Sequence, residues 1–137
     1  MVKTARDIMH EHTFVSGDMI VRDIAKLMSD KKIGSVLVEA DGDFGILTER
    51  DIVSKIIAGG KNPEKVKAKD IMTYPVFTIG PDAELYMISK IFNEKSFRRL
   101  PVVENGEVIG ILTTKDVAKQ FIPEFFKEMY HFKDFRF

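Results

Sequence analysis

The sequence predicts an α+β fold built from two similar repeats, each with the element order β-α-β-β-α, packed sheet to sheet. Two observations carry this prediction. The pattern Gly-Ile-Leu-Thr-x-x-Asp occurs at residues 45–51 and again at 110–116. Asp-Ile-Met also occurs twice, at 7–9 and 70–72, each time ahead of the longer pattern. An ordered set of motifs that occurs twice indicates an internal duplication.

The duplication divides the chain into a first repeat, a second repeat and an aromatic C-terminal tail. These parts are residues 1–60, 61–122 and 123–137. A sheet of about three short strands with two helices buries too little apolar surface to be stable alone. We therefore expect the repeats to form one unit with pseudo-twofold symmetry and two equivalent clefts between them.

Each repeat begins its sheet with a short β-type segment, predicted at residues 13–16 and 76–79. A turn follows in which Asp18 or Asp82 is well placed to cap the next helix. That helix is amphipathic in both repeats, because apolar residues recur on one face at helical spacing. The two apolar stripes, expected in the core, are Ile20, Ile24, Leu27 and Met28, and Leu85, Ile88, Ile91 and Phe92.

A hairpin is predicted next in each repeat. Asp41-Gly42 and Asn105-Gly106 are strong hairpin signals, and each lies between two apolar runs that contain β-branched residues. The runs are 35–39 and 44–47, and 100–104 and 108–112. A second helix is expected after each hairpin, and the first of these ends at Gly59-Gly60.

Composition excludes several classes of function. Lys and Arg together number 21, as do Asp and Glu, so the net charge is zero, which argues against a nucleic-acid binder that relies on a broad basic field. The absence of cysteine excludes disulfides and thiolate chemistry. No segment resembles a signal peptide or a membrane span, so we expect a cytoplasmic protein that does not bind a membrane.

Catalysis and metal binding are not expected either. His10, His12 and His131 have no cluster of further ligands near them in sequence. No nucleophile motif, Walker loop or dinucleotide fingerprint is present, and neither Asp51 nor Asp116 has a second carboxylate beside it for acid–base work. We therefore expect no catalytic residues, no metal and no catalytic cofactor.

The repeated Thr-x-x-Asp stretch has two interpretations. A buried strand that runs into a helix would bring a hydroxyl and a carboxylate to free backbone N–H groups, which suits a polyol next to an anion, as in a nucleotide. The same pattern is a capping box with Asp in place of the usual Glu, and it then needs no ligand. For one copy alone the capping interpretation is the stronger, and the matching context of two copies favours a ligand.

The ordered set of motifs resembles a tandem pair of cystathionine-β-synthase-type (CBS) domains over residues 5 to about 121. The motifs that carry the resemblance are both Asp-Ile-Met stretches, the strand Arg99-Leu100-Pro101-Val102-Val103, and both Gly-Ile-Leu-Thr-x-x-Asp stretches. The resemblance implies a regulatory module whose clefts between the repeats bind AMP, ADP, ATP or S-adenosylmethionine. Ligand binding would then pass a conformational change to an unidentified effector protein.

The candidate ligand contacts follow from this resemblance and from the chemistry of the side chains. Asp51 and Asp116 can accept hydrogen bonds from both hydroxyls of a ribose, and Thr48 and Thr113 can donate to a phosphate oxygen. The resemblance places the apolar walls for adenine after each Asp-Ile-Met. These wall residues are Phe14, Val15, Val76 and Phe77.

The repeats differ on the phosphate side. The second repeat has Arg98-Arg99 where the first has Gly34-Ser35, and Arg50 and Lys115 occupy the turn inside each Thr-x-x-Asp. Arginine suits phosphate because its fork can bind two oxygens at once. The alternative for Arg98-Arg99 is a solvated strand end. We expect two sites of unequal affinity, and the sequence leaves open which of them the arginines serve.

An alternative function is a structural or interaction module with empty clefts, whose aromatic tail mediates assembly. Residues 121–137 are rich in Phe and Tyr, and so much aromatic surface is not expected to stay in water. We expect the tail to form a subunit contact in a homodimer, with packing against its own domain as the alternative.

Overall fold

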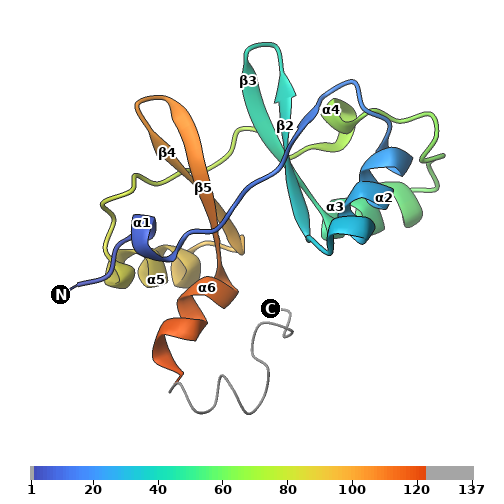
Figure 1. Cartoon of the computed structure of the whole chain (residues 1–137). Coiled ribbons are helices and arrows are strands. Elements are labelled where there is room, and N and C mark those ends of the chain that lie inside the picture. Colours follow the sequence, from blue (N-terminus) through green and yellow to red (C-terminus); the bar gives the residue numbers. More distant parts are fainter. Residues whose placement is uncertain (1, 123–137) are drawn as a thin grey trace. The chain divides into compact units, whose positions relative to one another are not determined.

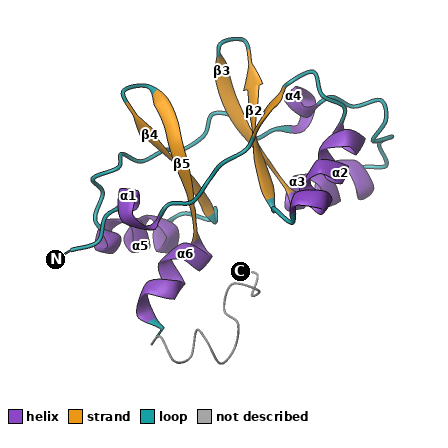
Figure 2. Cartoon of the chain, in the orientation of Figure 1, coloured by secondary structure: helices purple, strands orange, loops and turns teal. Residues whose placement is uncertain are grey.

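The computed structural model describes residues 2–122 of the 137-residue chain (Figures 1 and 2). The elements in chain order are α1 (Ala5–Ile8), β1 (Phe14–Ser16), α2 (Val21–Lys31), β2 (Ser35–Ala40), β3 (Asp43–Thr48), α3 (Glu49–Asp51), the π-helix η1 (Ile52–Ile57), α4 (Ala68–Ile71), α5 (Leu85–Glu94), β4 (Arg99–Glu104), β5 (Glu107–Thr113), α6 (Thr114–Ala118) and the 3-10 helix η2 (Lys119–Phe121). The mixture of helices and antiparallel strand pairs confirms the predicted α+β class.

The chain forms two compact units. The central unit is His12–Val76, and the terminal unit combines Met1–Glu11 with Phe77–Phe137. These units divide the chain at other places than the repeats 1–60 and 61–122 do. The first helix of each repeat lies in the unit that holds the rest of the other repeat.

Backbone hydrogen bonds hold the exchanged helices in place. At α1, the Ala5 N–H donates to the Ala83 carbonyl at 2.8 Å, and the His10 N–H donates to the Ile111 carbonyl at 3.0 Å. At α4, the Ala68 N–H donates to the Met19 carbonyl at 2.9 Å. Each exchanged helix thus satisfies its backbone in the unit that receives it.

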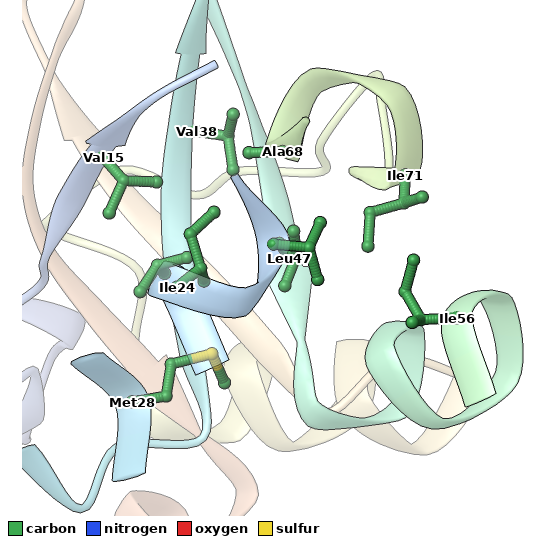
Figure 3. Packing of buried hydrophobic residues seen from close by; sticks show 10 residues of the cluster. Val15, Ile24, Met28, Val38, Leu47, Ile56, Ala68 and Ile71 are labelled. Carbon is green, nitrogen blue, oxygen red and sulfur yellow. The ribbon is translucent and has the colours of Figure 1, made fainter. Parts of the chain in front are cut away.

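The central unit has a three-stranded sheet in the order β1-β2-β3, with β1 parallel and β3 antiparallel to β2. One face of this sheet packs on α2, η1 and α4 around a buried apolar core (Figure 3). The core residues are Val15, Val21, Ile24, Met28, Val36, Val38, Leu47, Ile56, Ala68 and Ile71. The predicted stripe of the first amphipathic helix therefore packs into the core, although Ile20 is 38% exposed.

The terminal unit repeats this arrangement with a smaller sheet, in which β4 and β5 form an antiparallel pair. Its buried residues are Ala5, Ile8, Ile79, Ile88, Leu100, Val102, Leu112 and Val117. They come from α1, α5, α6, both strands and the segment around residue 79. Both predicted hairpins are confirmed, and their turns have the positive φ angles that two-residue hairpin loops require, with Asp41 at 52° and Asn105 at 52°.

The β segment predicted at residues 76–79 is reduced to one parallel bridge, between Ile79 and Val102. In the central unit the Leu37 N–H donates to the Thr13 carbonyl at 2.8 Å and so begins the pairing of β1 with β2. The equivalent of Leu37 in β4 is Pro101, which has no N–H to donate. The prediction of a full strand was wrong because this donor is missing.

The predicted helix caps at Asp18 and Asp82 were also wrong. The N-cap residues of α2 and α5 are Ile20 and Glu84, and neither makes a side-chain cap hydrogen bond. The Asp18 carboxylate instead pairs with Lys69 of α4, with 3.0 Å between Oδ1 and Nζ. Asp18 therefore helps to hold the exchanged helix against the central unit.

The helix after each hairpin differs between the units. In the central unit, α3 runs into the π-helix η1, whereas in the terminal unit α6 runs into the 3-10 helix η2. No helix in residues 2–122 is long and apolar enough to cross a membrane. The predicted aromatic tail at 123–137 lies outside the described residues.

Candidate functional site

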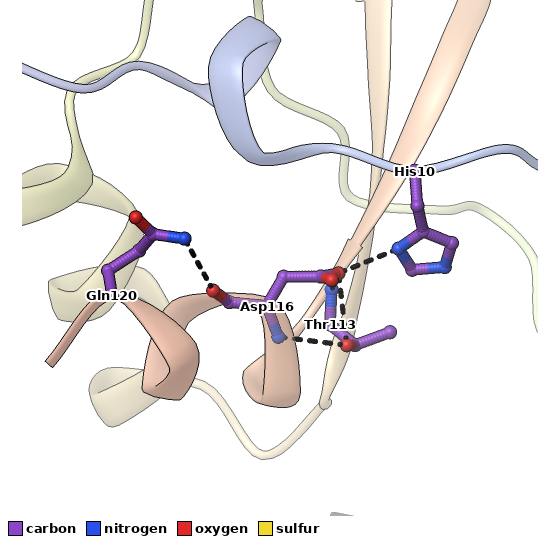
Figure 4. A network of polar contacts seen from close by, with 4 residues as sticks. All are labelled: His10, Thr113, Asp116 and Gln120. Carbon is purple, nitrogen blue, oxygen red and sulfur yellow. Dashed lines mark hydrogen bonds and ion pairs between the residues drawn. The ribbon is translucent and has the colours of Figure 1, made fainter. Parts of the chain in front are cut away.

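The second Thr-x-x-Asp stretch forms a polar corner at the junction of β5 and α6 (Figure 4). The Thr113 N–H and hydroxyl donate to Asp116 Oδ2 at 2.8 and 3.1 Å, and the Asp116 N–H donates to Thr113 Oγ1 at 3.3 Å. Asp116 is buried, with a residue exposure of 9%. The turn of the chain thus holds one carboxylate oxygen firmly in place.

The first Thr-x-x-Asp stretch has the same geometry at the junction of β3 and α3. The Thr48 N–H and hydroxyl donate to Asp51 Oδ2 at 2.9 and 3.2 Å, and the Asp51 N–H donates to Thr48 Oγ1 at 3.3 Å. Asp51 is 8% exposed. Both stretches are therefore capping boxes, as the structural interpretation of the sequence predicted.

A capping box alone does not indicate a ligand, because a third one occurs at α1. There the Thr4 N–H and hydroxyl donate to Asp7 Oδ2 at 2.9 and 3.1 Å, and these hydrogen bonds lower the pKa of the Asp7 carboxyl below its ordinary value. Asp7 is solvent-exposed, whereas Asp51 and Asp116 are buried. Burial distinguishes the two corner carboxylates from an ordinary cap, since a buried charge needs further partners.

Those further partners differ between the corners. Asp116 Oδ2 also contacts His10 Nδ1 at 2.8 Å, so all the hydrogen bonds that described residues make with this carboxylate go to Oδ2 (Figure 4). At Asp51 the additional partner is Lys55, whose Nζ lies 3.1 Å from Oδ1 and donates to the Ile71 carbonyl at 2.8 Å. Among residues 2–122, the Asp51 carboxylate thus has partners on both oxygens, and the Asp116 carboxylate on Oδ2 alone.

The sequence did not identify His10 and Lys55 as partners of the corner carboxylates. Lys55 stands four residues after Asp51 on the same helical segment, a spacing that brings opposite charges together, so the pair could have been found. His10 reaches Asp116 only because α1 packs in the terminal unit, and no local pattern carries that information.

Arg98 and Arg99 lie beside the second corner along the backbone. Arg99 pairs with Thr113 across β4 and β5, and the Thr114 N–H donates to the Arg98 carbonyl at 3.1 Å. Gly34 takes the equivalent place in the central unit, where its carbonyl accepts from the Glu49 N–H at 3.1 Å. Arg98 and Arg99 therefore lie in the same unit as Thr113, Lys115 and Asp116, next to that corner along the strands.

The predicted adenine walls are divided between the units. Phe14 is 42% exposed and has Phe44 and His12 as edge-on ring neighbours, whereas Val15 points into the core. In the terminal unit, Phe77 is 44% exposed, with Phe97 at 5.5 Å between ring centroids and Lys95 Nζ at 5.7 Å from its ring. Val76 and Arg50 lie in the central unit, where Arg50 is exposed. No cluster of His, Asp and Glu within residues 2–122 could hold a metal ion.

Known proteins that are similar to this chain include members of the CBS-domain family. The family model of the CBS domain matches residues 5–58 and 68–122. Hypoxic response protein 1 of Mycobacterium tuberculosis is 32% identical over 88% of this chain and 86% of its own length. An uncharacterized protein of Methanopyrus kandleri is 46% identical over 71% of this chain, and the match spans only 51% of that relative.

Among solved structures, a hexameric CBS-CP12 protein from bloom-forming cyanobacteria is similar to this chain. It aligns with a TM-score of 0.80 and 30% identity, covering 93% of this chain and 75% of its own. The cyanobacterial protein also shows that domains of this kind occur in multimers.

Proposed function

The chain belongs to the CBS-domain family as a tandem pair, a regulatory ligand-binding module, and we propose that it senses an adenine nucleotide or a related adenosyl ligand. AMP, ADP and ATP are the proposed ligands, with S-adenosylmethionine as a further one. Binding at the Thr-x-x-Asp corners shifts the balance between two arrangements of the chain, which a partner protein reads. Such a shift requires that the ligand bind one arrangement more tightly than the other.

The observation that carries this proposal is the Asp116 carboxylate. It is buried, and its described hydrogen-bond partners all contact Oδ2. An ionised carboxylate can accept about four hydrogen bonds over its two oxygens. Oδ1, which has no hydrogen-bond partner among residues 2–122, is the proposed acceptor for the hydroxyls of a ribose, while Oδ2 holds the side chain in a fixed orientation.

The surroundings of Asp116 suit the anionic part of a nucleotide. Three basic residues, Arg98, Arg99 and Lys115, lie close to it in sequence or across the strands. Arginine binds phosphate oxygens in pairs, and the Thr113 hydroxyl can turn to donate to one. We propose that the arginines bind the phosphate while Asp116 binds the sugar.

We propose further that the protein acts without catalysis, as a homodimer that presents its ligand-dependent state to an effector. The multimeric CBS-CP12 protein supports self-association. The competing function is a structural module with empty corners, and the third capping box at Thr4 and Asp7 shows that the motif also forms where no ligand is proposed.

Thermal unfolding with and without ligand separates the two functions. A ligand present at 100 times its Kd stabilises a protein by about 2.7 kcal/mol, which raises Tm by roughly 5 °C or more. We expect AMP, ADP, ATP or S-adenosylmethionine to give such a rise. We also expect Asp116→Ala to abolish it.

Two comparisons make this experiment decisive. Asp116→Ala also removes a helix cap worth about 1 kcal/mol, so the ligand-induced shift of each protein is compared with its own ligand-free Tm. Asp7→Ala removes a similar capping box at α1 and is expected to lower Tm while keeping the full ligand shift. Equal Tm with and without all four ligands would support the structural function instead.

A further inference from the structure

The two corners differ in the basic side chain that contacts the carboxylate. Lys55 Nζ lies 3.1 Å from Asp51 Oδ1, which is the oxygen left over by the capping box, because Thr48 donates to Oδ2. His10 Nδ1 lies 2.8 Å from Asp116 Oδ2, which is the oxygen that Thr113 already uses. Lys55 thus contacts the oxygen whose counterpart on Asp116, Oδ1, has no hydrogen-bond partner among residues 2–122.

We propose that Lys55 determines which corner binds the ligand: it closes the Asp51 corner to a ligand hydroxyl and leaves the Asp116 corner as the stronger site. This inference rests on the proposed nucleotide binding, and it assigns the first nucleotide that binds to the Asp116 corner. Lys55 acts as a specificity-determining residue, because its ammonium group competes with a sugar hydroxyl for Asp51 Oδ1 and takes up space beside it.

The surroundings of Lys55 hold it in this position. Its ammonium group also donates to the Ile71 carbonyl at 2.8 Å, at the end of α4. The Asp51 side chain is 11% exposed, whereas the Lys55 side chain is 41% exposed. A hydroxyl that displaced Lys55 from Asp51 Oδ1 would break this ion pair and leave the Ile71 carbonyl with one partner fewer.

The position equivalent to Lys55 in the second repeat is Gln120, four residues after Asp116. Its side-chain amide donates to the Asp116 backbone carbonyl at 3.5 Å and so does not engage the carboxylate (Figure 4). The duplicated chain therefore contains its own comparison: the same helical position carries a cation in one repeat and a neutral amide in the other.

The residues proposed to bind phosphate also favour the Asp116 corner over the Asp51 corner. The second corner has Arg98 and Arg99 at the positions that Gly34 and Ser35 occupy beside the first. A nucleotide at the Asp116 corner would thus meet a carboxylate oxygen that has no hydrogen-bond partner among residues 2–122, with Arg98 and Arg99 nearby at the beginning of β4. At the Asp51 corner it meets an occupied oxygen and lacks the arginines.

Isothermal titration of the full chain with AMP, ADP, ATP and S-adenosylmethionine tests this assignment. Displacing the Lys55 ammonium group from its ion pair with Asp51 and its hydrogen bond to Ile71 is expected to weaken a ligand by roughly tenfold, so the unaltered protein is expected to bind in two steps that differ by about tenfold in Kd. In Lys55→Met the weaker step is expected to tighten by roughly tenfold, while the stronger step is unchanged. Gln120→Met is the matched control and is expected to leave both steps as they are.

The outcomes are distinguishable. Two equal sites in the unaltered protein, or a weaker step that Lys55→Met leaves unchanged, would overturn the role of Lys55 and leave nucleotide binding intact. Loss of a binding step in Lys55→Met would also overturn it, because the ammonium group would then be a ligand contact. The absence of heat from all three proteins with all four ligands would overturn the proposed nucleotide binding, and this inference with it.

Discussion

Asp51 and Asp116 occupy equivalent positions in the two repeats but contact different side chains, the Lys55 ammonium group in one case and the His10 imidazole in the other. The Thr-x-x-Asp pattern predicts the capping geometry of both corners, because that geometry depends on residues only three apart. Lys55 stands at a helical position that carries Gln120 in the other repeat, and His10 follows the exchanged helix α1. The pattern could therefore predict the corners but not their inequality.

Gly45 in β3 and Gly110 in β5 lie where the residues that follow the exchanged helices α4 and α1 pack closely against these strands. A Cβ at Gly45 would lie 2.5 Å from Met72 Sδ and 2.8 Å from the Thr73 carbonyl oxygen. At Gly110 it would lie 2.5 Å from Met9 Sδ, and its other close neighbours are also atoms of the Met9 side chain. A methionine side chain can move away from a methyl group more easily than a backbone carbonyl can.

We therefore expect Gly45→Ala to reduce the free energy of unfolding by about 1–3 kcal/mol, and Gly110→Ala to reduce it by less. Gly80→Ala is the control, since no atom lies within 4 Å of the added Cβ, and it is expected to stay within about 0.5 kcal/mol of the unaltered protein. Urea unfolding at constant m-value measures all three. A larger loss for Gly110→Ala than for Gly45→Ala would contradict the packing of Met72 and Thr73 against β3.

At the scale of elements, the helices and hairpins were predictable because their signals are local. The apolar stripes predicted α2 and α5, and the Asp-Gly and Asn-Gly turns predicted both hairpins. The strand at residues 76–79 was predicted wrongly because its pairing depends on a donor in another strand. Pro101 was the available signal, since a proline inside a strand removes one hydrogen bond of the ladder.

The attachment of α4 to the central unit has a predictable pH dependence. Asp18 contacts Lys69 at 3.0 Å and Lys67 at 3.6 Å, and the hydrogen bond and charge of Lys69 lower the pKa of the Asp18 carboxyl below its ordinary value of 3.8. A carboxyl whose pKa is lower in the folded chain stabilises the fold above the unfolded value. That contribution is lost as the pH falls through the folded pKa.

We accordingly expect Asp18→Asn to be less stable than the unaltered protein at pH 6, with the difference shrinking as the pH falls below about 4. Urea unfolding at a series of pH values measures it. Asp82→Asn, at the equivalent turn of the terminal unit, controls for the loss of a negative charge, since no ion pair of Asp82 occurs among the described residues. A stability difference for Asp18→Asn that persists unchanged at pH 2 to 3 would show that the pair with Lys69 does not contribute.

At the scale of the whole molecule, the compact units have other boundaries than the sequence repeats. The first helix of each repeat packs in the unit that holds the rest of the other repeat. Ala68 and Ile71 complete the core of the central unit, and Ala5 and Ile8 complete that of the terminal unit. The two Asp-Ile-Met segments are nearly identical in sequence, so either could pack on either repeat as far as local patterns show. The similarity of these segments made the duplication predictable, but it could not show in which unit each first helix packs. The packing of the repeats sheet to sheet stays a prediction.

The central claim is that a nucleotide binds first at the Asp116 corner, and amide chemical shifts test it most directly. In a titration of ¹⁵N-labelled protein with AMP, and then with ADP, ATP and S-adenosylmethionine, we expect the first shifts to occur at the amides of residues 113–116 and of Arg98 and Arg99. The amides of residues 48–51 should respond only at higher ligand concentrations. First shifts at residues 48–51, or no shifts with any of the four ligands, would contradict the claim.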